Sequence, residues 1–281
     1  MADVQVVDTY VYKGLRFELL KATSTVAAHP TVSITAPPGT VILGGGAYDD
    51  WDGPGAISAS PIGNLLTGIF PSDDGTTWTA SGKDHLQSSP ASIVAYVIVA
   101  QRSDRTPIPR EYYTIVSQTS AVAPHPTQQV NLPAGFSIVG GGARANYGTG
   151  LGSMLYASNP TPDLQGWVGA AKDHIQPDPA SITVWAIGLK QSFLEELGLL
   201  RDLTLSSGTT AAVAHHPRLA IVVPDFHLTG GGARVNWTGV GSLLTASFPV
   251  DRQTWVAEGK DHIQSDPATI TAYAVGFKTS E

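Results

Sequence analysis

The chain is predicted to be an all-β protein of three tandem antiparallel β-sandwich-like repeats, because three observations in its sequence agree. One sixteen-residue block occurs three times, beginning at Trp78, Trp167 and Trp255. Short runs rich in Val, Ile, Thr, Tyr and Trp recur along the 281 residues, which is typical of strands. Thirty Gly and twenty Pro residues punctuate these runs, and only 14% of the residues are charged. Self-similarity at a fixed period dictates the architecture, so it is considered before any other pattern.

The repeated block is ungapped in all three copies. Lys-Asp-His begins five residues after each Trp, and a Pro follows seven residues after that Lys. The copies start 89 and 88 residues apart, close to the ~100-residue scale of a single domain. We therefore expect a unit in each of the ranges 1–101, 102–190 and 191–281. Packing the three units around a pseudo-threefold axis is the favoured arrangement, with a linear array as the alternative.

Each unit repeats the same order of features. A His-Pro step comes first, then Gly-Gly-Gly-Ala, then Asp or Asn before an aromatic residue, then an apolar run ending in Pro, then the Trp block. Turn signals every 8–12 residues predict an antiparallel arrangement. In the first unit we expect strands over 14–23, 31–36, 40–49, 64–70, 76–84 and 92–100. Residues 52–63 form an insertion that the other copies lack, which places them in a loop.

Two further segments are predicted from their composition. Residues 101–110 are polar and contain two prolines, which suits a linker, and Phe193, Leu194, Leu197 and Leu200 have the spacing of a helix of about three turns. The last strand of each unit is apolar on both faces, as in Ile182 to Leu189. Such a strand needs cover on both sides, from packing between units or from oligomerisation.

Composition excludes several classes of protein. The chain has no Cys, which removes disulfides, thiolate metal sites and a Cys nucleophile, and mildly favours a reducing compartment. The net charge of −7 without a basic cluster argues against nucleic acid as a partner. No apolar run approaches the ~18 residues of a membrane span, and the first residues lack the pattern of a secretion signal. We expect a soluble protein without a cofactor, in the cytoplasm or secreted.

Side-chain alternation assigns the residues of the repeated block to two faces of a strand. Trp and the Asp of Lys-Asp-His share one face, and the Lys and His share the other. A carboxylate beside a buried indole requires hydrogen-bond donors. The glycines permit a bulge with free amide groups, so we expect the Asp residues to fix a turn or bulge there. Unless that bulge shifts the register, Arg144 and Asn146 share a face, as do Arg234 and Asn236.

The recurring polar and aromatic residues favour a carbohydrate site in each unit. Sugar hydroxyls bond to polar side chains, while an aromatic face covers the apolar side of the sugar ring. A repeated weak site also suits multivalent binding better than catalysis. We expect a glycan or other small polar ligand, held by outward-facing residues of these sites: Asp50, Trp51, Lys83, Asp84, His85, Arg144, Asn146, Tyr147, Lys172, Asp173, His174, Arg234, Asn236, Trp237, Lys260, Asp261 and His262.

Three alternatives stay open. The aromatics Trp51, Tyr147 and Trp237 could be core residues, and the whole repeat could serve only the fold and assembly. The chain could also be a metal-dependent enzyme, in which His85, His174 and His262 meet on an axis and bind Zn or Cu with an open position for water, although the chain lacks short His spacing. His29, His125 and His216 are typical turn residues that could also reach Lys-Asp-His. No Ser keeps its place in the copies for a catalytic triad, and the glycines do not continue as a phosphate loop. No motif is specific enough to name a family.

Overall fold

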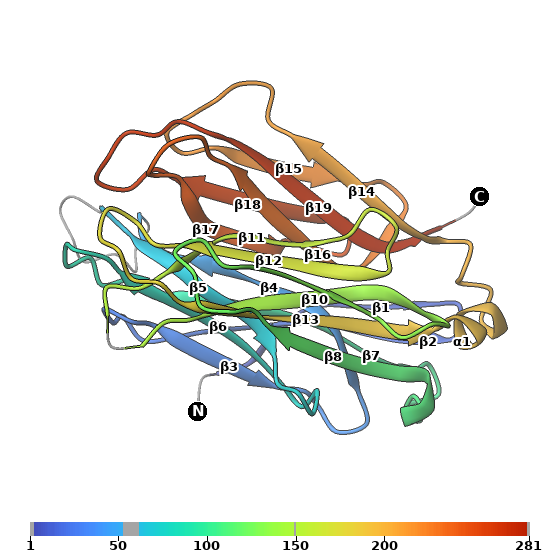
Figure 1. Cartoon of the computed structure of the whole chain (residues 1–281). Helices are drawn as coiled ribbons and strands as arrows, with labels where there is room; N and C mark the ends of the chain where they lie inside the picture. Colours follow the sequence, from blue (N-terminus) through green and yellow to red (C-terminus); the bar gives the residue numbers. More distant parts are fainter. Residues whose placement is uncertain (1–2, 53–61, 149, 280–281) are drawn as a thin grey trace.

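The computed structural model describes residues 3–52, 62–148 and 150–279, and the regular secondary structure of this part of the chain is almost entirely β-strand (Figure 1). The three expected units 1–101, 102–190 and 191–281 are called the first, second and third range. The strands of the first range are β1 (Gln5–Tyr12), β2 (Leu15–Thr23), β3 (Thr31–Thr35), β4 (Val41–Asp49), β5 (Asn64–Pro71), β6 (Thr77–Asp84) and β7 (Ile93–Arg102), the last of which extends one residue into the second. Those of the second are β8 (Tyr113–Thr119), β9 (Thr127–Asn131), β10 (Phe136–Asn146), β11 (Met154–Pro160), β12 (Gly166–Lys172) and β13 (Ser181–Lys190). Those of the third are β14 (Leu203–Thr209), β15 (Arg218–Val222), β16 (Phe226–Asn236), β17 (Leu243–Pro249), β18 (Thr254–Lys260) and β19 (Thr269–Lys278). The all-β prediction is confirmed.

The strands form three antiparallel sheets, and each sheet combines two of the three ranges. The orders are β1-β2-β7-β4-β17-β18-β15, β3-β6-β5-β10-β13-β8 and β14-β19-β16-β11-β12-β9. The first range therefore shares one sheet with the third range and another with the second, while the second and third share the remaining sheet. The chain is interwoven, because no sheet belongs to one range alone.

Each junction between ranges is a short strand pairing. β4 meets β17 through Tyr48–Ala246 and Ala47–Ser247, and the junctions β10–β5 and β16–β11 are also two residue pairs long. The third glycine of each triplet lies here: a Cβ on Gly46 would come 2.5 Å from the Cα of Phe248 on the facing strand. A side chain at that position would force the junction apart, since real Cβ atoms do not approach other atoms so closely.

The glycine-rich strands β4, β10 and β16 contact one another at the centre of the molecule. The first glycines of the triplets, Gly44, Gly140 and Gly230, pack backbone to backbone, and a Cβ on Gly140 would lie 2.8 Å from the Cα of Gly44. The register shifts by one residue just before each of these glycines. The bulge predicted at the glycines is confirmed, and it lies immediately before the first glycine of each triplet.

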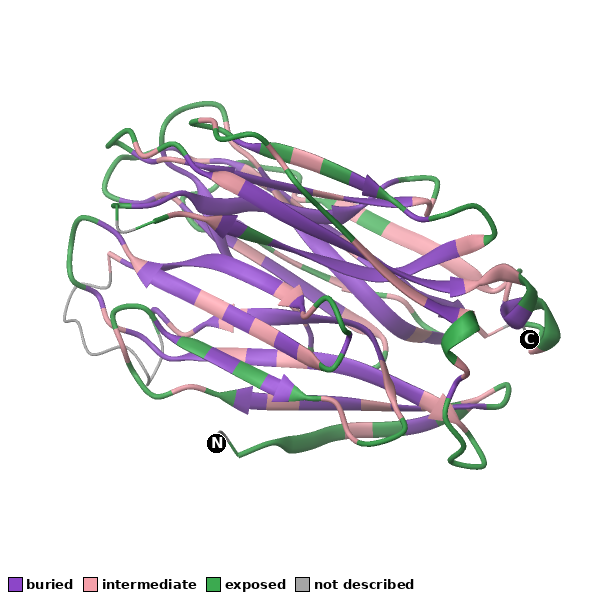
Figure 2. Ribbon diagram, turned by 60° about the horizontal axis from the view of Figure 1, so that its bottom comes forward, coloured by how far each residue is buried: buried purple, intermediate pink, exposed green. Residues whose placement is uncertain are grey.

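The core surrounds this centre. Trp78, Trp167 and Trp255 are fully buried, and each indole lies over the second glycine of a triplet. Figure 2 shows the strands as mostly buried and the connecting loops as mostly exposed. β13 is buried on both faces along most of its length within the single chain.

Each strand expected in the first unit is present in the structure, and its ends differ from the expected ends by at most two residues. β1 was not predicted, because its residues are mostly exposed at the edge of a sheet. The predicted helix is present as α1 (Gln191–Glu196) but shorter than expected, since Gly198 adopts a positive φ of 67° soon after it. At the end of the segment expected to be a linker, Arg110–Tyr112 form a 3-10 turn. Most of the predicted insertion, residues 53–61, lies outside the described residues.

In the described part of the chain, the structure has no helix of the length and apolar character needed to cross a membrane.

Candidate functional site

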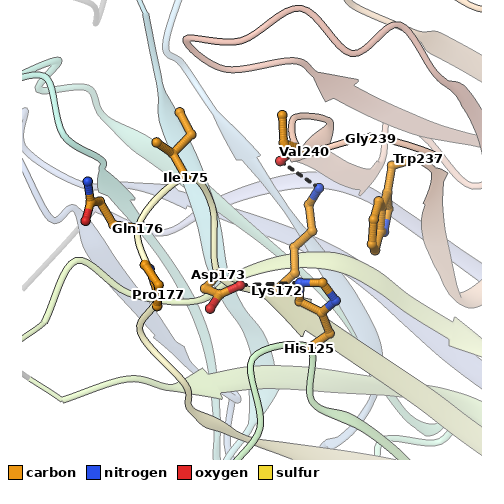
Figure 3. Close-up of a pocket in the computed structure, with 9 residues that line it drawn as sticks. All are labelled: His125, Lys172, Asp173, Ile175, Gln176, Pro177, Trp237, Gly239 and Val240. Carbon is orange, nitrogen blue, oxygen red and sulfur yellow. Dashed lines mark hydrogen bonds and ion pairs between the residues drawn. The ribbon is translucent and has the colours of Figure 1, made fainter.

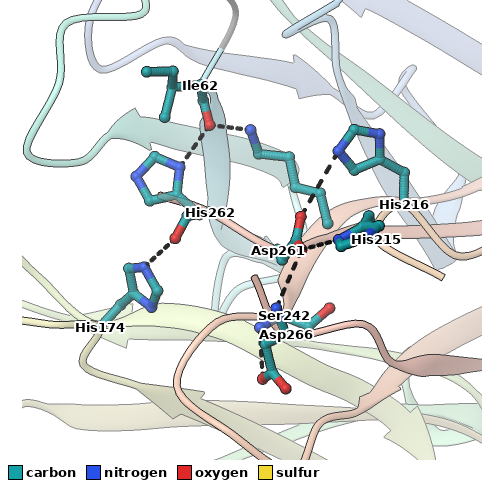
Figure 4. A network of polar contacts seen from close by, with 9 residues as sticks. Ile62, His174, His215, His216, Ser242, Asp261, His262 and Asp266 are labelled. Carbon is teal, nitrogen blue, oxygen red and sulfur yellow. Dashed lines mark hydrogen bonds and ion pairs between the residues drawn. The ribbon is translucent and has the colours of Figure 1, made fainter. Parts of the chain in front are cut away.

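The three Lys-Asp-His motifs meet at one place, where their histidines form a closed ring. The Nε2 atom of His85 lies 2.7 Å from the carbonyl oxygen of His174, that of His174 lies 2.7 Å from the carbonyl of His262, and that of His262 lies 2.9 Å from the carbonyl of His85. The imidazole centroids are 5.3–5.6 Å apart, and all three side chains are 1% exposed. Figure 4 shows part of this network around His174 and His262. Each contact joins two different ranges of the chain.

The second nitrogen of each imidazole faces a loop carbonyl from the following range. The Nδ1 atoms of His85, His174 and His262 lie 2.9, 2.6 and 2.6 Å from the carbonyl oxygens of Leu151, Val240 and Ile62, respectively. A neutral imidazole donates from only one nitrogen, so two carbonyl neighbours favour protonation. Burial acts the other way and prevails: it lowers the pKa of His174, and it lowers the pKa of His262 to about 4. These two rings are therefore neutral at neutral pH.

The lysines of the motifs are held by the same loop carbonyls. Lys172 Nζ donates to the Val240 carbonyl at 3.1 Å and lies 4.0 Å from the centroid of the Trp237 ring. Lys83 repeats this with Leu151 and Tyr147, and Lys260 with Ile62 and Trp51. Burial lowers the pKa of Lys172 and of Lys260 to about 8, while nearby carboxylates oppose the shift.

The lysines and histidines do not face outward as the sequence predicted. Lys83, Lys172 and Lys260 are 1–2% exposed, because a loop and an aromatic side chain of another range cover them. Alternation along a strand correctly separated these residues from the Trp residues. It could not show that a segment more than 60 residues away would cover the second face. A ligand at the surface meets the neighbours of these residues rather than the lysines and histidines themselves.

The aspartates of the motifs fix a turn, as predicted, but with a different donor. Asp84, Asp173 and Asp261 each accept a hydrogen bond from the backbone N–H five residues later, at 3.2–3.3 Å. The expected donors, the amides of the glycine segment, are not used. The same carboxylates bridge to the histidines of the His-Pro steps: His125 Nε2 lies 3.3 Å from Asp173 Oδ1, and His29 pairs likewise with Asp84.

The third Asp has two histidine neighbours. Asp261 Oδ2 lies 2.5 Å from Nδ1 of His215, and its Oδ1 lies 3.9 Å from Nε2 of His216. The imidazoles of His125 and His216 also contact an aromatic ring edge-on, with centroids 5.4 Å from Trp237 and 5.2 Å from Trp51. The histidines of the His-Pro steps are more than half exposed, so the Asp–His pairs form the accessible part of each motif.

One such pair lines a pocket of about 200 Å³ between two ranges of the chain (Figure 3). His125, Lys172 and Asp173 lie on one side, and Trp237 and the carbonyl-bearing loop at Val240 lie on the other. The turn after the motif adds Ile175, Gln176 and Pro177 to the lining. The pocket therefore offers a carboxylate, an imidazole and an indole to one small ligand.

The Asn and Arg residues of the predicted sites lie at the ends of β10 and β16. Asn146 donates its amide to Ser181 and Thr183, and Asn236 donates to Thr269 and Thr271, so both amides serve the sheet. Arg144 Nε donates to Asn146 Oδ1 at 2.9 Å, which confirms that these two share a face. In the first range, Asp50 accepts from Tyr48 at 3.2 Å, and Trp51 is buried. Tyr147 and Trp237 are half-buried.

Two functional residues were missed by the sequence reasoning. Asp266 accepts backbone hydrogen bonds from Gly239, Gly241 and Ser242, and Asp178 accepts one from Gly152. Each aspartate thereby holds the loop whose carbonyl receives Lys and His from a neighbouring range. A sequence feature that could have identified these two aspartates is the Asp-Pro step in the second and third copies of the repeated block. The first copy has Ser89 before its Pro.

The histidine ring offers little to a metal ion. Each of its six nitrogens faces a backbone carbonyl within 2.9 Å, and no described group of three or more His, Asp or Glu residues could hold a metal. The ring consequently joins the three ranges through hydrogen bonds.

Comparison with known proteins adds no identity to this geometry. The sequence matches no family model, and it matches none of the curated proteins.

Proposed function

We propose that the chain is a multivalent carbohydrate-binding protein, with three tandem repeats arranged around a pseudo-threefold axis and up to three similar sites between them. The cyclic order of contacts supports the arrangement. The motif of the first range binds a loop of the second, the second binds the third, and the third binds the first. The equivalent packing of Gly44, Gly140 and Gly230 at one centre supports it as well.

The observation that carries the proposal is the pocket between Asp173 and Trp237. Its open side presents a carboxylate bridged to a half-exposed imidazole, next to the face of an indole. A carboxylate accepts hydrogen bonds from sugar hydroxyls, and an indole covers the apolar face of a sugar ring. Lys172 Nζ lies 4.0 Å from the centroid of the Trp237 ring and holds the indole in place.

The size of the pocket sets the expected affinity. At about 200 Å³ it is smaller than the ~300–1,000 Å³ of sites for drug-sized ligands, so it suits one or two sugar rings bound weakly. The histidine centroids are at most 5.6 Å apart, so the three adjacent Asp–His pairs surround a common axis. A branched or clustered glycan could engage several of them, which would raise the apparent affinity by about 10²–10⁴.

A glycan array with the folded protein, followed by titration of the best ligand, tests the proposal. We expect H125A and D173N to weaken binding at least several-fold while the melting temperature stays close to that of the wild type. E111A, which removes an exposed carboxylate elsewhere, is the matched control. Absence of binding to any glycan by the folded protein would refute the proposal.

A second candidate function is a structural scaffold, and the burial of the lysines and histidines favours it. Their hydrogen bonds go to backbone carbonyls of the same chain, so these residues hold the three ranges together. If this is the whole role, K172A and H174A will lower stability, and H125A will change nothing measurable. The response to H125A separates the two candidates, because the His125 side chain is half exposed and meets another range through edge-on packing on Trp237.

A further inference from the structure

A second groove lies on the outer face of the sheet at the junction of β5 and β10. It has a volume of about 370 Å³ and is lined by Thr67, Ser81, Arg144, Asn146 and Tyr147. The groove is separate from the pocket at Asp173, because the two share no lining residue. Two hydroxyls, one guanidinium and one phenol reach it from two ranges of the chain.

Arg144 is the exposed cation of this groove and is held in one orientation. Its guanidinium carbon lies 5.1 Å from the centroid of the Phe70 ring and 5.9 Å from that of Trp185, and these two rings stack on each other at 5.1 Å. Its Nε atom donates to Asn146, which is itself anchored by Ser181 and Thr183. The guanidinium forms no ion pair with any residue that the structure describes. Its two terminal nitrogens can therefore donate to a ligand.

The junction of β11 and β16 repeats the arrangement. Arg234 lies with its guanidinium carbon 5.7 Å from the Tyr156 ring, and it too forms no ion pair within the described residues. The ring of Trp237 lies edge-on to Tyr156 at 5.6 Å. A second guanidinium is thus fixed beside aromatic rings at the equivalent position.

The third junction, between β4 and β17, has the opposite character. Tyr48 takes the place of the arginine and donates to Asp50, and the nearby strand β18 carries Glu258, which is paired with Arg218. Two junctions therefore carry an arginine without an ion pair among the described residues, whereas the third carries Tyr48 bonded to Asp50 and Glu258 paired with Arg218.

We propose that the groove at Arg144 and the junction at Arg234 each bind the carboxylate of an acidic saccharide, a uronate unit, and that the junction at Tyr48 does not. The inference rests on the proposed carbohydrate-binding function and names its ligand class. A guanidinium edge matches a planar carboxylate with two parallel hydrogen bonds. Ser81 supplies a hydroxyl for a neighbouring sugar hydroxyl, and the buried hydroxyl of Thr67 holds it in place at 3.0 Å. Because the whole chain carries a charge of −7, selection of an acidic ligand has to come from these local cations.

Calorimetric titration with trigalacturonate, a neutral galactose trimer and a sulfated galactose trimer tests the inference. The wild type is expected to bind trigalacturonate at two sites per chain and more tightly than either other trimer. R144Q and R234Q should each remove one of these sites, and the double variant should lose about tenfold or more in affinity. R252Q, which makes the same charge change at an exposed turn, should bind as the wild type does.

The outcomes separate this inference from the proposed function. Equal binding of the neutral and uronate trimers, unchanged in the double variant, overturns the acidic ligand and leaves carbohydrate binding standing. Equal, arginine-dependent binding of the sulfated trimer overturns the choice of carboxylate. If no saccharide of any class binds, both proposals fail. The melting temperature of each variant shows that a lost site is not a lost fold.

Discussion

The imidazole of His174 and the backbone carbonyl of His262 are joined at 2.7 Å, one of three such contacts that close a ring through the whole chain. A neutral ring is required at this buried place, since burial lowers the pKa of His262 to about 4. In the unfolded chain, histidine titrates near 6.5. The unfolded state therefore binds more protons between pH 6.5 and 4, and stability falls as the pH drops through this window.

The free energy of unfolding is accordingly expected to decrease by about 2 kcal/mol between pH 7 and 4.5 through His262. Urea unfolding at several pH values measures it. H262Q removes the titrating group, so it should be less stable at pH 7 but have a flatter pH profile. An unchanged slope in H262Q would contradict the assignment.

Asp49 is a fully buried carboxyl whose two oxygens have no hydrogen-bond partner among the residues that the structure describes. It pairs across its sheet with Ile93, as Ala145 and Val235 pair with Ile182 and Ile270. Burial raises its pKa well above the usual range, so the folded state holds the extra proton and loses stability as the pH rises above about 4. D49V should therefore stabilise the protein by about 1–3 kcal/mol at pH 7 and by less at pH 4.

The reciprocal change is the control for Asp49. A145D introduces the same carboxyl at the corresponding position of β10 and should destabilise the protein at pH 7. Thermal unfolding of both variants at pH 4 and pH 7 measures the difference. Destabilisation by D49V at neutral pH would mean that the attraction between Asp49 and Lys260 outweighs the cost of burial.

The sequence was informative where the structure is local. Strand lengths, the bulge before Gly140 and the burial of Trp167 follow from alternation and from residue types that admit one backbone arrangement. The burial of Lys83 cannot be predicted in this way, because Leu151, which covers it, is 68 residues away in sequence and belongs to another range. Alternation identifies the two faces of a strand but not the segment that packs on each face.

In the candidate site, too, local features could be predicted from the sequence and contacts between ranges could not. Turn formation by Asp173 could be foreseen, since a carboxylate beside a buried indole must be paired. The role of Asp266 could not be predicted from the sequence. Its three amide donors lie in a loop whose path depends on contacts with Lys172 and His174. A pattern within one range of the sequence therefore cannot identify residues whose contacts are with another range.

The close packing of the first glycines makes Gly140 sensitive to the smallest substitution. A Cβ there would meet the backbone of Leu43 and lie 2.8 Å from the Cα of Gly44, and both neighbours are backbone atoms at the centre of three sheets. G140A is expected to destabilise the protein by about 3 kcal/mol, at the upper end of overpacking costs. G148A is the control, because a Cβ at that exposed glycine meets nothing within 4 Å. Equal melting temperatures for the two variants would rule out the tight central packing.

The loop that receives Lys172 and His174 depends on Asp266, whose carboxylate is 6% exposed and accepts amide hydrogen bonds from Gly239, Gly241 and Ser242. D266S installs the residue found at Ser89 and leaves these donors unpaired, which should cost about 2 kcal/mol. Hydrogen exchange at the three amides is expected to rise well above that of the β19 core, together with weaker glycan binding beside Trp237. D251S, at an exposed turn, should leave both properties unchanged. If the three amides stay protected in D266S, the carboxylate does not hold the loop, and the Val240 carbonyl is positioned by Lys172 and His174 alone.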